Sequence, residues 1–503
     1  AHGEPEAQKN TQAILEHLKK EYGIQTFFLE GAWSKLEPSL LQFSNNAEKN
    51  QKILSELTEK GIVGGPENFL YENSPRDSGH GTQATDVAGY GIESLELYKK
   101  NWEQFRAVMG AKAESDAFLS EMKAGLLTKA SQVLNHELAD YFRQWSFHEE
   151  IESDYSAHLR VLAGKVQAHL GLDLGDAREQ YDWPMFVRFM KLKFLETQTA
   201  DRRPDVRVEV QRLAEWLEEK KLSSYRWLLS GLGPSAFGPE ITVSGPREDF
   251  EEFYEKAAPL GFKFKDYPSL SKEWGKQILA QELDVQTLLK ETETLENKLI
   301  KKLAQTAEEK KFVAKYREYL LLKKLLNLEL SCDEWHKINP EVEGRRSEDA
   351  GSVVGTRGSG LGTGIEATTQ KARDFYSTAE ARDSVMVERT IDWIKKEKIE
   401  KAAIITGGFH SKGIGGLLKQ KNISYLRVHP RITQIHGREN YLKLMMPANS
   451  ASEVSRTTPG VTAVSYLRAV SPAEPDAPAA FRNALAAQAA VTSSPRFKMR
   501  GDL

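Results

Sequence analysis

Apolar runs along the chain predict three short strands that each lead to a polar residue. Residues 25–30 and 87–93 are rich in aromatic and aliphatic side chains, and each run ends in an acid. A third run, residues 402–405, contains neighbouring β-branched side chains, which is typical of a strand buried on both faces. Two glycines, a phenylalanine and then His410 follow it shortly. We expect these strands to lie in one sheet.

Helical spacing predicts most of the remaining structure. Residues 6–22 form an amphipathic pattern that stops at Gly23, and Ser94 suits the N-cap of a helix that begins after the second strand. The pattern stays mostly helical as far as residue 330. Within residues 273–330 leucines recur at helical spacing, which predicts two helices packed as a bundle core or a coiled-coil seam.

Two stretches contain many turn-forming residues. Residues 61–81 hold several glycine and proline dipeptides and predict turns. Residues 341–366 are charged and then rich in glycine, which suggests a phosphate-binding loop. This stretch follows no credible strand and lacks the Gly-Lys-Ser/Thr ending that binds phosphates, so we expect a flexible loop.

Two further strands, a helix and a disordered tail are also predicted. Residues 423–429 form a strand candidate that Pro430 stops, and residues 240–243 form another short one. A helix is expected at residues 379–396, before the third strand. Beyond residue 447 the chain is rich in alanine, serine and proline, which predicts a mostly disordered tail.

This order of elements predicts an α/β fold. Its mostly parallel central sheet is split by a large, mostly helical insertion that includes a long helical hairpin or coiled-coil-like arm. The predicted segments are two halves of the α/β core at 1–110 and 376–446, the helical insertion at 111–340, a flexible loop at 341–375, and the tail at 447–503.

Composition excludes several classes of protein. Hydrophobic residues make up 40% of the 503 positions and charged residues 28%, enough for an ordinary globular core. The net charge of −3 and the small basic clusters, which lack an aromatic platform, do not favour nucleic acid as a partner. Cys332 is the single cysteine, so neither an internal disulfide nor a cysteine-based zinc site is expected. No apolar run is long enough for a transmembrane helix.

The polar residues that end the strands predict a functional site. Parallel strands present their carboxyl ends at one edge of a sheet, where such folds bind ligands. Glu30, Glu93 and His410 should therefore lie close together. His2 precedes the first helix, and an upstream strand would place it in a position equivalent to that of His410.

These residues suit two hydrolytic mechanisms. Two histidines and a carboxylate, here His2, His410 and Glu30, can hold a divalent metal that activates water, with a free carboxylate as general base. Without metal, a histidine can act as general base while Arg382 stabilises an oxyanion. Glu4 and the loop residue His80 are possible additional site residues.

Other histidines have weaker signals. His148 precedes Glu149, but no second histidine follows at the spacing of a zinc-protease helix. His429 and His436 flank Pro430 and have little support as site residues.

Short motifs at both ends of the chain occur in a definite order. Ala381-Arg382-Asp383, followed by Met386, precedes the last of them. The others are Ala1-His2-Gly3-Glu4, Phe28-Leu29-Glu30-Gly31-Ala32, Tyr90-Gly91-Ile92-Glu93 and Ile404-Ile405-Thr406-Gly407-Gly408-Phe409-His410. Together they resemble bacterial proteins whose first strand ends in an Asp-Ala-His motif. They are also similar to the wider Tiki/TraB superfamily, which includes erythromycin-esterase-like and ChaN-like proteins.

The resemblance covers residues 1–110 and 260–435 and implies several functions. Tiki members resemble metal-dependent proteases, the esterase branch uses histidine-activated water, and the ChaN branch binds haem. Matching positions imply a site of His2, Glu30, Arg382 and His410. The first strand of the pattern is missing from this sequence, which suggests a truncated N-terminus.

Three hypotheses follow from the sequence. The first is a hydrolase of ester or peptide bonds, with or without a divalent metal, that acts on a small molecule or peptide. The second is a non-enzymatic protein that binds haem or a metal through the same histidines. The third is a helical interaction protein that self-associates through its long helices. A bacterial protein of any of these kinds could be cytoplasmic, or exported if a leader was lost.

Overall fold

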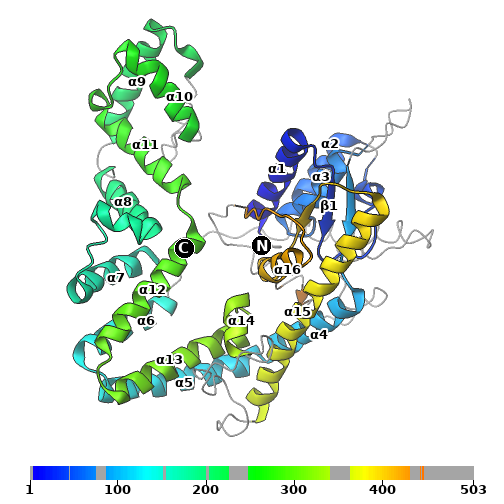
Figure 1. The fold of residues 1–503 in the computed structure, drawn as a ribbon, viewed down its shortest axis with the longest axis vertical. Coiled ribbons are helices and arrows are strands. Elements are labelled where there is room, and N and C mark those ends of the chain that lie inside the picture. The colour runs from blue at the N-terminus through cyan, green and yellow to red at the C-terminus, as the bar shows by residue number, and fades with distance from the viewer. Residues whose placement is uncertain are drawn as a thin grey trace, which may run out of the picture. The chain divides into compact units, whose positions relative to one another are not determined.

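A computed structural model describes residues 4–44, 46–74, 87–150, 155–199, 203–225, 247–339, 363–430, 442 and 445–446. The chain divides into two compact units. Unit 1 consists of Ala1–Ala124 together with Arg317–Leu503, and unit 2 consists of Gly125–Tyr316. The described residues are mostly helical and contain a three-stranded parallel sheet (Figure 1).

The sheet lies in unit 1 and has the strand order β2-β1-β3. These strands are β1 (Thr26–Leu29), β2 (Ala88–Gly91) and β3 (Ala403–Ile405). Both neighbours pair with β1 in parallel, with Leu29 opposite Gly91 on one side and opposite Ile405 on the other. The three predicted strands and their parallel arrangement are therefore confirmed.

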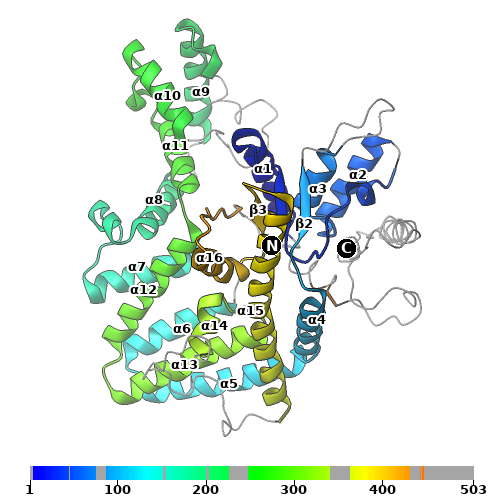
Figure 2. The ribbon, with the colours of Figure 1, turned by 45° about the vertical axis from the view of Figure 1, so that its right-hand side comes forward.

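Helices cover both faces of the sheet. Successive side chains of a strand point to opposite faces, so neighbouring residues of β1 contact different helices. Phe27 and Leu29 pack with Leu15 of α1 (Pro5–Tyr22) and with Phe69 of α3 (Gly65–Glu72). Phe28 packs on the other face with residues of α15 (Thr363–Glu397) and α16 (His410–Gln420). Figure 2 shows the sheet strands beside these helices.

Unit 1 contains further helices besides those that cover the sheet. They are η1 (Pro38–Leu41), α2 (Ala47–Glu59), α4 (Leu95–Gly110), α14 (Cys332–Ile338), and parts of α5 (Lys112–Val133) and α13 (Ala307–Leu326). Ser94 caps α4 by accepting a hydrogen bond from the Leu97 amide, and Gly23 ends α1 in the left-handed conformation. Both predicted helix boundaries are confirmed.

All regular secondary structure in the described residues of unit 2 is helical. Besides parts of α5 and α13 it contains α6 (His136–Glu150), α7 (Tyr155–Leu170), η2 (Ala177–Tyr181), α8 (Pro184–Thr199), α9 (Arg203–Glu219), α10 (Arg247–Ala257), η4 (Ala258–Leu260), η5 (Phe264–Asp266), α11 (Pro268–Gln281) and α12 (Val285–Leu303). The leucines of α12 that share the predicted stripe, such as Leu295 and Leu299, are fully buried.

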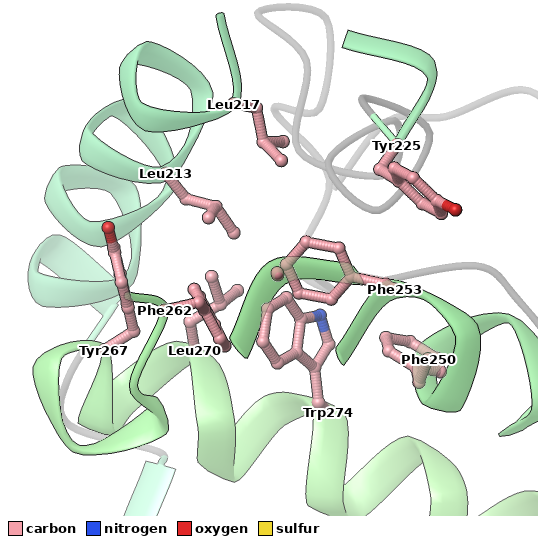
Figure 3. Packing of buried hydrophobic residues seen from close by; sticks show 10 residues of the cluster. Leu213, Leu217, Tyr225, Phe250, Phe253, Phe262, Tyr267, Leu270 and Trp274 are labelled. Carbon is pink, nitrogen blue, oxygen red and sulfur yellow. The ribbon is translucent and has the colours of Figure 1, made fainter. Parts of the chain in front are cut away.

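An aromatic cluster forms one core of unit 2 (Figure 3). Phe253 of α10 and Trp274 of α11 lie at its centre, with their ring centroids 6.2 Å apart. Leu213 and Leu217 of α9 close one side. The buried carboxylate of Glu209, in α9, accepts hydrogen bonds from the backbone amides of Ser269 and Leu270. It thereby caps the N-terminus of α11.

Several predictions about elements were wrong. Part of the predicted turn region is the helix α3, which begins at Gly65 with Pro66 in its first turn, a position that tolerates proline. Residues 363–375, predicted as flexible loop, belong to the 35-residue helix α15. The region 273–330 holds parts of three helices rather than two, because α11 ends before Asp284 caps α12.

Two strand predictions also need correction. Residues 423–429 have no regular secondary structure and pair with no strand among the described residues. Arg427 instead donates a hydrogen bond to the Ser411 carbonyl, and the Tyr425 hydroxyl lies against Gly415. The residues of β3 are only partly buried, since β3 is an edge strand of the described sheet.

The remaining predictions about segments have mixed outcomes. Unit 2 is shorter than the insertion predicted at 111–340. The predicted strand at 240–243, the glycine-rich stretch before residue 363 and the tail after 447 lie outside the described residues. No helix in the described part of the chain is both long and apolar enough to cross a membrane.

Candidate functional site

A buried cluster of charged side chains lies at the carboxyl edge of the sheet. Glu30 directly follows β1, Glu93 lies two residues after β2, and His410 begins α16 after β3. Arg382 and Asp383 come from the middle of α15. Each of these five residues is at most 7% exposed. The parallel sheet therefore brings the three predicted strand-end residues together with the predicted arginine.

Arg382 is the centre of this cluster. Its Nη2 donates hydrogen bonds to Glu93 Oε2 at 2.7 Å and to Glu30 Oε1 at 2.9 Å. Its Nε lies 3.2 Å from both carboxylate oxygens of Glu93. One guanidinium thus joins the ends of two neighbouring strands, in the fork geometry for which arginine is suited.

Helix α4 fixes the remaining side of the guanidinium. Asn101 Oδ1 accepts a hydrogen bond from Arg382 Nη1 at 2.8 Å. The Asn101 amide in turn donates to the Phe375 carbonyl of α15 at 2.8 Å, and the Tyr98 ring lies 5.4 Å from the guanidinium carbon. Arg382 is therefore held in one orientation by polar and aromatic partners.

His410 lies between two carboxylates. Its Nδ1 is 2.6 Å from Asp383 Oδ1, and its Nε2 is 3.4 Å from Glu30 Oε1. Asp383 can approach so closely because Gly413 has no side chain. A Cβ atom at position 413 would lie 1.9 Å from Asp383 Oδ2. The pair Asp383–His410 has the geometry of a carboxylate that orients an imidazole.

Glu30 connects the arginine to the histidine. Besides its contacts with Arg382 and His410, its Oε2 accepts a hydrogen bond from the Gly407 backbone amide at 2.5 Å. The side chains alternate in charge along the order Asp383, His410, Glu30, Arg382, Glu93. Alternation allows buried charges to compensate one another.

The protonation of the cluster follows from these contacts. Burial opposes a charge on the imidazole, but the Glu30 carboxylate and the hydrogen bond to Asp383 outweigh burial and raise the pKa of His410 above 6.5. Burial raises the pKa of Asp383, although its hydrogen bond with His410 acts in the opposite direction. Burial also disfavours the charged guanidinium, yet Glu30 and Glu93 raise the pKa of Arg382.

The described residues do not by themselves form a metal site. Within them, no three histidine, cysteine, aspartate or glutamate side chains are placed to hold a metal ion. Glu30 is already paired with the positive charge of Arg382, which would repel a second cation nearby. Because His2 lies outside the described residues, the predicted ligand set of His2, Glu30 and His410 stays a prediction.

The other candidate residues have different outcomes. His80, His436 and, in its side chain, His148 lie outside what the structure describes. Glu4 is buried at the start of α1 and is not among the side chains joined by the hydrogen bonds above. His429 is exposed. His158, the other histidine that is buried among the described residues, pairs with Glu296 within unit 2.

Sequence reasoning missed two members of the cluster, Asp383 and Asn101. Asp383 had no signal of its own, because adjacent residues of a helix point in different directions. Asn101 did have one. It occupies the same helical face as the buried residues Phe105 and Val108, and a polar residue on an apolar face needs a polar partner.

Comparison of the chain with protein-family models, curated proteins and solved structures found no match. The resemblance of its short motifs to the Tiki/TraB superfamily therefore stays a prediction, and a function has to be inferred from the charged cluster itself.

Proposed function

We propose that this protein is a hydrolase of ester or peptide bonds, of the Tiki/TraB and erythromycin-esterase-like type. The observation that carries the proposal is the contact of Nδ1 of the buried His410 with Asp383, beside an arginine at the carboxyl edge of a parallel sheet. A carboxylate that fixes one ring nitrogen prepares the other, Nε2, for proton transfer.

Each residue has a role in the proposed reaction. His410 Nε2 takes a proton from water, and the resulting hydroxide attacks the carbonyl carbon of the substrate. Arg382 stabilises the negative charge that develops on the carbonyl oxygen. The bond to the leaving group then breaks, and His410 Nε2 returns the proton to the leaving oxygen or nitrogen. Asp383 stabilises the imidazolium in between, and Glu93 and Asn101 hold Arg382 in place.

Glu30 has a different place in this scheme. At rest its carboxylate faces His410 Nε2, the atom that must reach water. Glu30 therefore keeps the proton on His410 until the carboxylate moves or is protonated. Substrate binding that displaces Glu30 would free Nε2 for proton transfer.

The proposal can be tested with a panel of activated esters and short peptides. We expect His410→Ala and Arg382→Met each to lower any detected hydrolysis by roughly 10²–10⁴-fold, because each removes a group that acts in the transition state. The measurement is kcat/KM on purified full-length protein, with circular dichroism to check folding.

His158→Ala is the matched control. His158 is also buried and bonded to a carboxylate, 2.7 Å from Glu296, but lies in unit 2. If His158→Ala and His410→Ala lower kcat/KM equally, the loss of hydrolysis reflects general destabilisation of the protein. Hydrolysis that survives His410→Ala in a folded protein would rule out the proposed mechanism.

The alternative functions predict other outcomes. A haem-binding protein would show a Soret band on addition of haem, abolished by His410→Ala. An interaction protein would self-associate through its long helices whether or not His410 is present. In the described residues both ring nitrogens of His410 face carboxylates, which favours acid–base chemistry over ligation of haem iron.

A further inference from the structure

We propose that the Gly407 amide, Arg382 and His410 form a carboxylate-binding cradle, which Glu30 fills in the resting protein and which a free carboxylate can fill in its place. The cradle belongs to α15, to the turn after β3 and to the first residue of α16, whereas Glu30 enters it from the end of β1. The donors and the group that they hold thus come from separate parts of the sheet edge.

In the described part of the chain, two hydrogen-bond donors and one ion-pair partner surround the Glu30 carboxylate. Gly407 N lies 2.5 Å from Oε2, while Arg382 Nη2 and His410 Nε2 lie 2.9 Å and 3.4 Å from Oε1. Arg382 and His410 are 6% and 5% exposed, so water competes little for them. A backbone amide, a guanidinium and an imidazolium are the donors that bind carboxylates most strongly.

The charges around the cradle also suit an external anion. Without Glu30, two carboxylates, Glu93 and Asp383, face two cations, Arg382 and the protonated His410. An incoming carboxylate gives the cluster the same set of charged groups that it has with Glu30. The cradle is built independently of Glu30, because Glu93 and Asn101 position the guanidinium and Asp383 positions the imidazole.

The cradle is a binding site, and its existence does not depend on hydrolysis. One extension rests on the proposed function: the carboxylate that hydrolysis of an ester or peptide bond releases can fill the cradle in place of Glu30 and should inhibit the reaction, because it then engages Arg382 and His410 Nε2. Formate binding, by contrast, can be measured whether or not the protein hydrolyses anything.

Replacing Glu30 by alanine tests the cradle, because it leaves space for a carboxylate as small as formate. In the Glu30→Ala variant we expect about 100 mM formate to raise the melting temperature by roughly 2–4 °C in a saturable manner. Formamide has nearly the same shape without the charge and should have no effect. Sodium chloride at equal ionic strength controls for screening.

Two further variants complete the test. Glu30→Gln keeps the space filled and should not respond to formate, and the double variant Glu30→Ala with Arg382→Met should lose the response. If Glu30→Ala does not fold alone, refolding in formate but not in formamide should restore its circular dichroism. Equal effects of formate and formamide, no effect of either, or a response that survives loss of Arg382 would each overturn the proposal.

Discussion

Arg382 shows how one side chain organises a buried site. Two carboxylates share its guanidinium, and Asn101 takes the remaining nitrogen. Breaking a buried ion pair by removing one partner typically costs about 3–5 kcal/mol, because the other charge stays buried without compensation. The cluster is therefore sensitive to the loss of any member, and its titration is sensitive to neighbours.

Stability should depend on the protonation of His410. Its pKa is raised in the folded protein, so protonated His410 stabilises the fold fully below pH 6.5 and this contribution is lost as pH rises through the raised pKa. We expect the free energy of unfolding of the wild type to fall over this window relative to that of His410→Gln. Denaturant titrations at a series of pH values measure the difference.

The same shift predicts the pH dependence of hydrolysis. A general base must be unprotonated, so the rate should rise with pH through a pKa above 6.5. In Asp383→Asn the rise should occur at lower pH, because the negative charge that holds the proton is gone. A pH profile unchanged in Asp383→Asn would contradict the role given to this pair.

At the residue scale the sequence predicts which strands end in functional side chains, but not the contacts that orient these side chains. Glu30, Glu93 and His410 were predictable because parallel strands present their ends at one edge. Arg382 was predicted as an oxyanion stabiliser and from the motif resemblance, not as a residue that ends a strand. The orientation of Arg382 by Asn101 and of His410 by Asp383 depends on helix-to-sheet packing, which no local pattern specifies.

Helix α16 illustrates the role of a single element. It begins with His410 and carries glycines at positions 413, 415 and 416, which lower its intrinsic stability. Gly413 makes room for Asp383, and Gly415 lies against the Tyr425 hydroxyl. Glycine at positions 413 and 415 thus lowers the intrinsic stability of the helix but allows other side chains to approach it closely.

Alanine substitutions in α16 separate these two effects. Gly413→Ala should destabilise the protein by about 1–3 kcal/mol, because the new Cβ overlaps Asp383. Gly416→Ala should be neutral or stabilise it by up to about 1 kcal/mol, since nothing lies within 4 Å of that position. Thermal unfolding of both variants tests this prediction, and stabilisation by Gly413→Ala would contradict the close approach of Asp383.

Elements were predictable where the pattern was local and strong. The strand β1 and the helix α1 have clear periods and clear ends, and both were predicted within two residues. The stretch 423–429 has a strand composition but contacts α16 through Tyr425 and Arg427, so tertiary contacts decide against its pairing. The helix α3 was missed because its glycine and proline begin a helix rather than a turn.

At the scale of the molecule, each unit has a core of its own. Phe253 belongs to the aromatic cluster of unit 2 and is 1% exposed, while Phe69 packs under the sheet of unit 1 and is 2% exposed. Cores without shared residues allow units to unfold separately.

Matched substitutions can test this independence. Phe253→Ala and Phe69→Ala should each cost about 3–5 kcal/mol, but each should lower a different transition in scanning calorimetry. When each substitution is combined with Glu30→Ala, only Phe69→Ala should weaken the rise in melting temperature that formate causes. A single transition that shifts equally in both variants would show that the units unfold together.

The long separation between Glu30 and Arg382 has a consequence for synthesis of the protein. The two residues are 352 positions apart, which at the usual pace of translation corresponds to roughly 20–70 s. All of unit 2 leaves the ribosome within that interval. Glu30 and Glu93 must stay hydrated until Arg382 arrives, because burying them unpaired is too costly. On the ribosome the helical unit can therefore be complete while the sheet edge is still open.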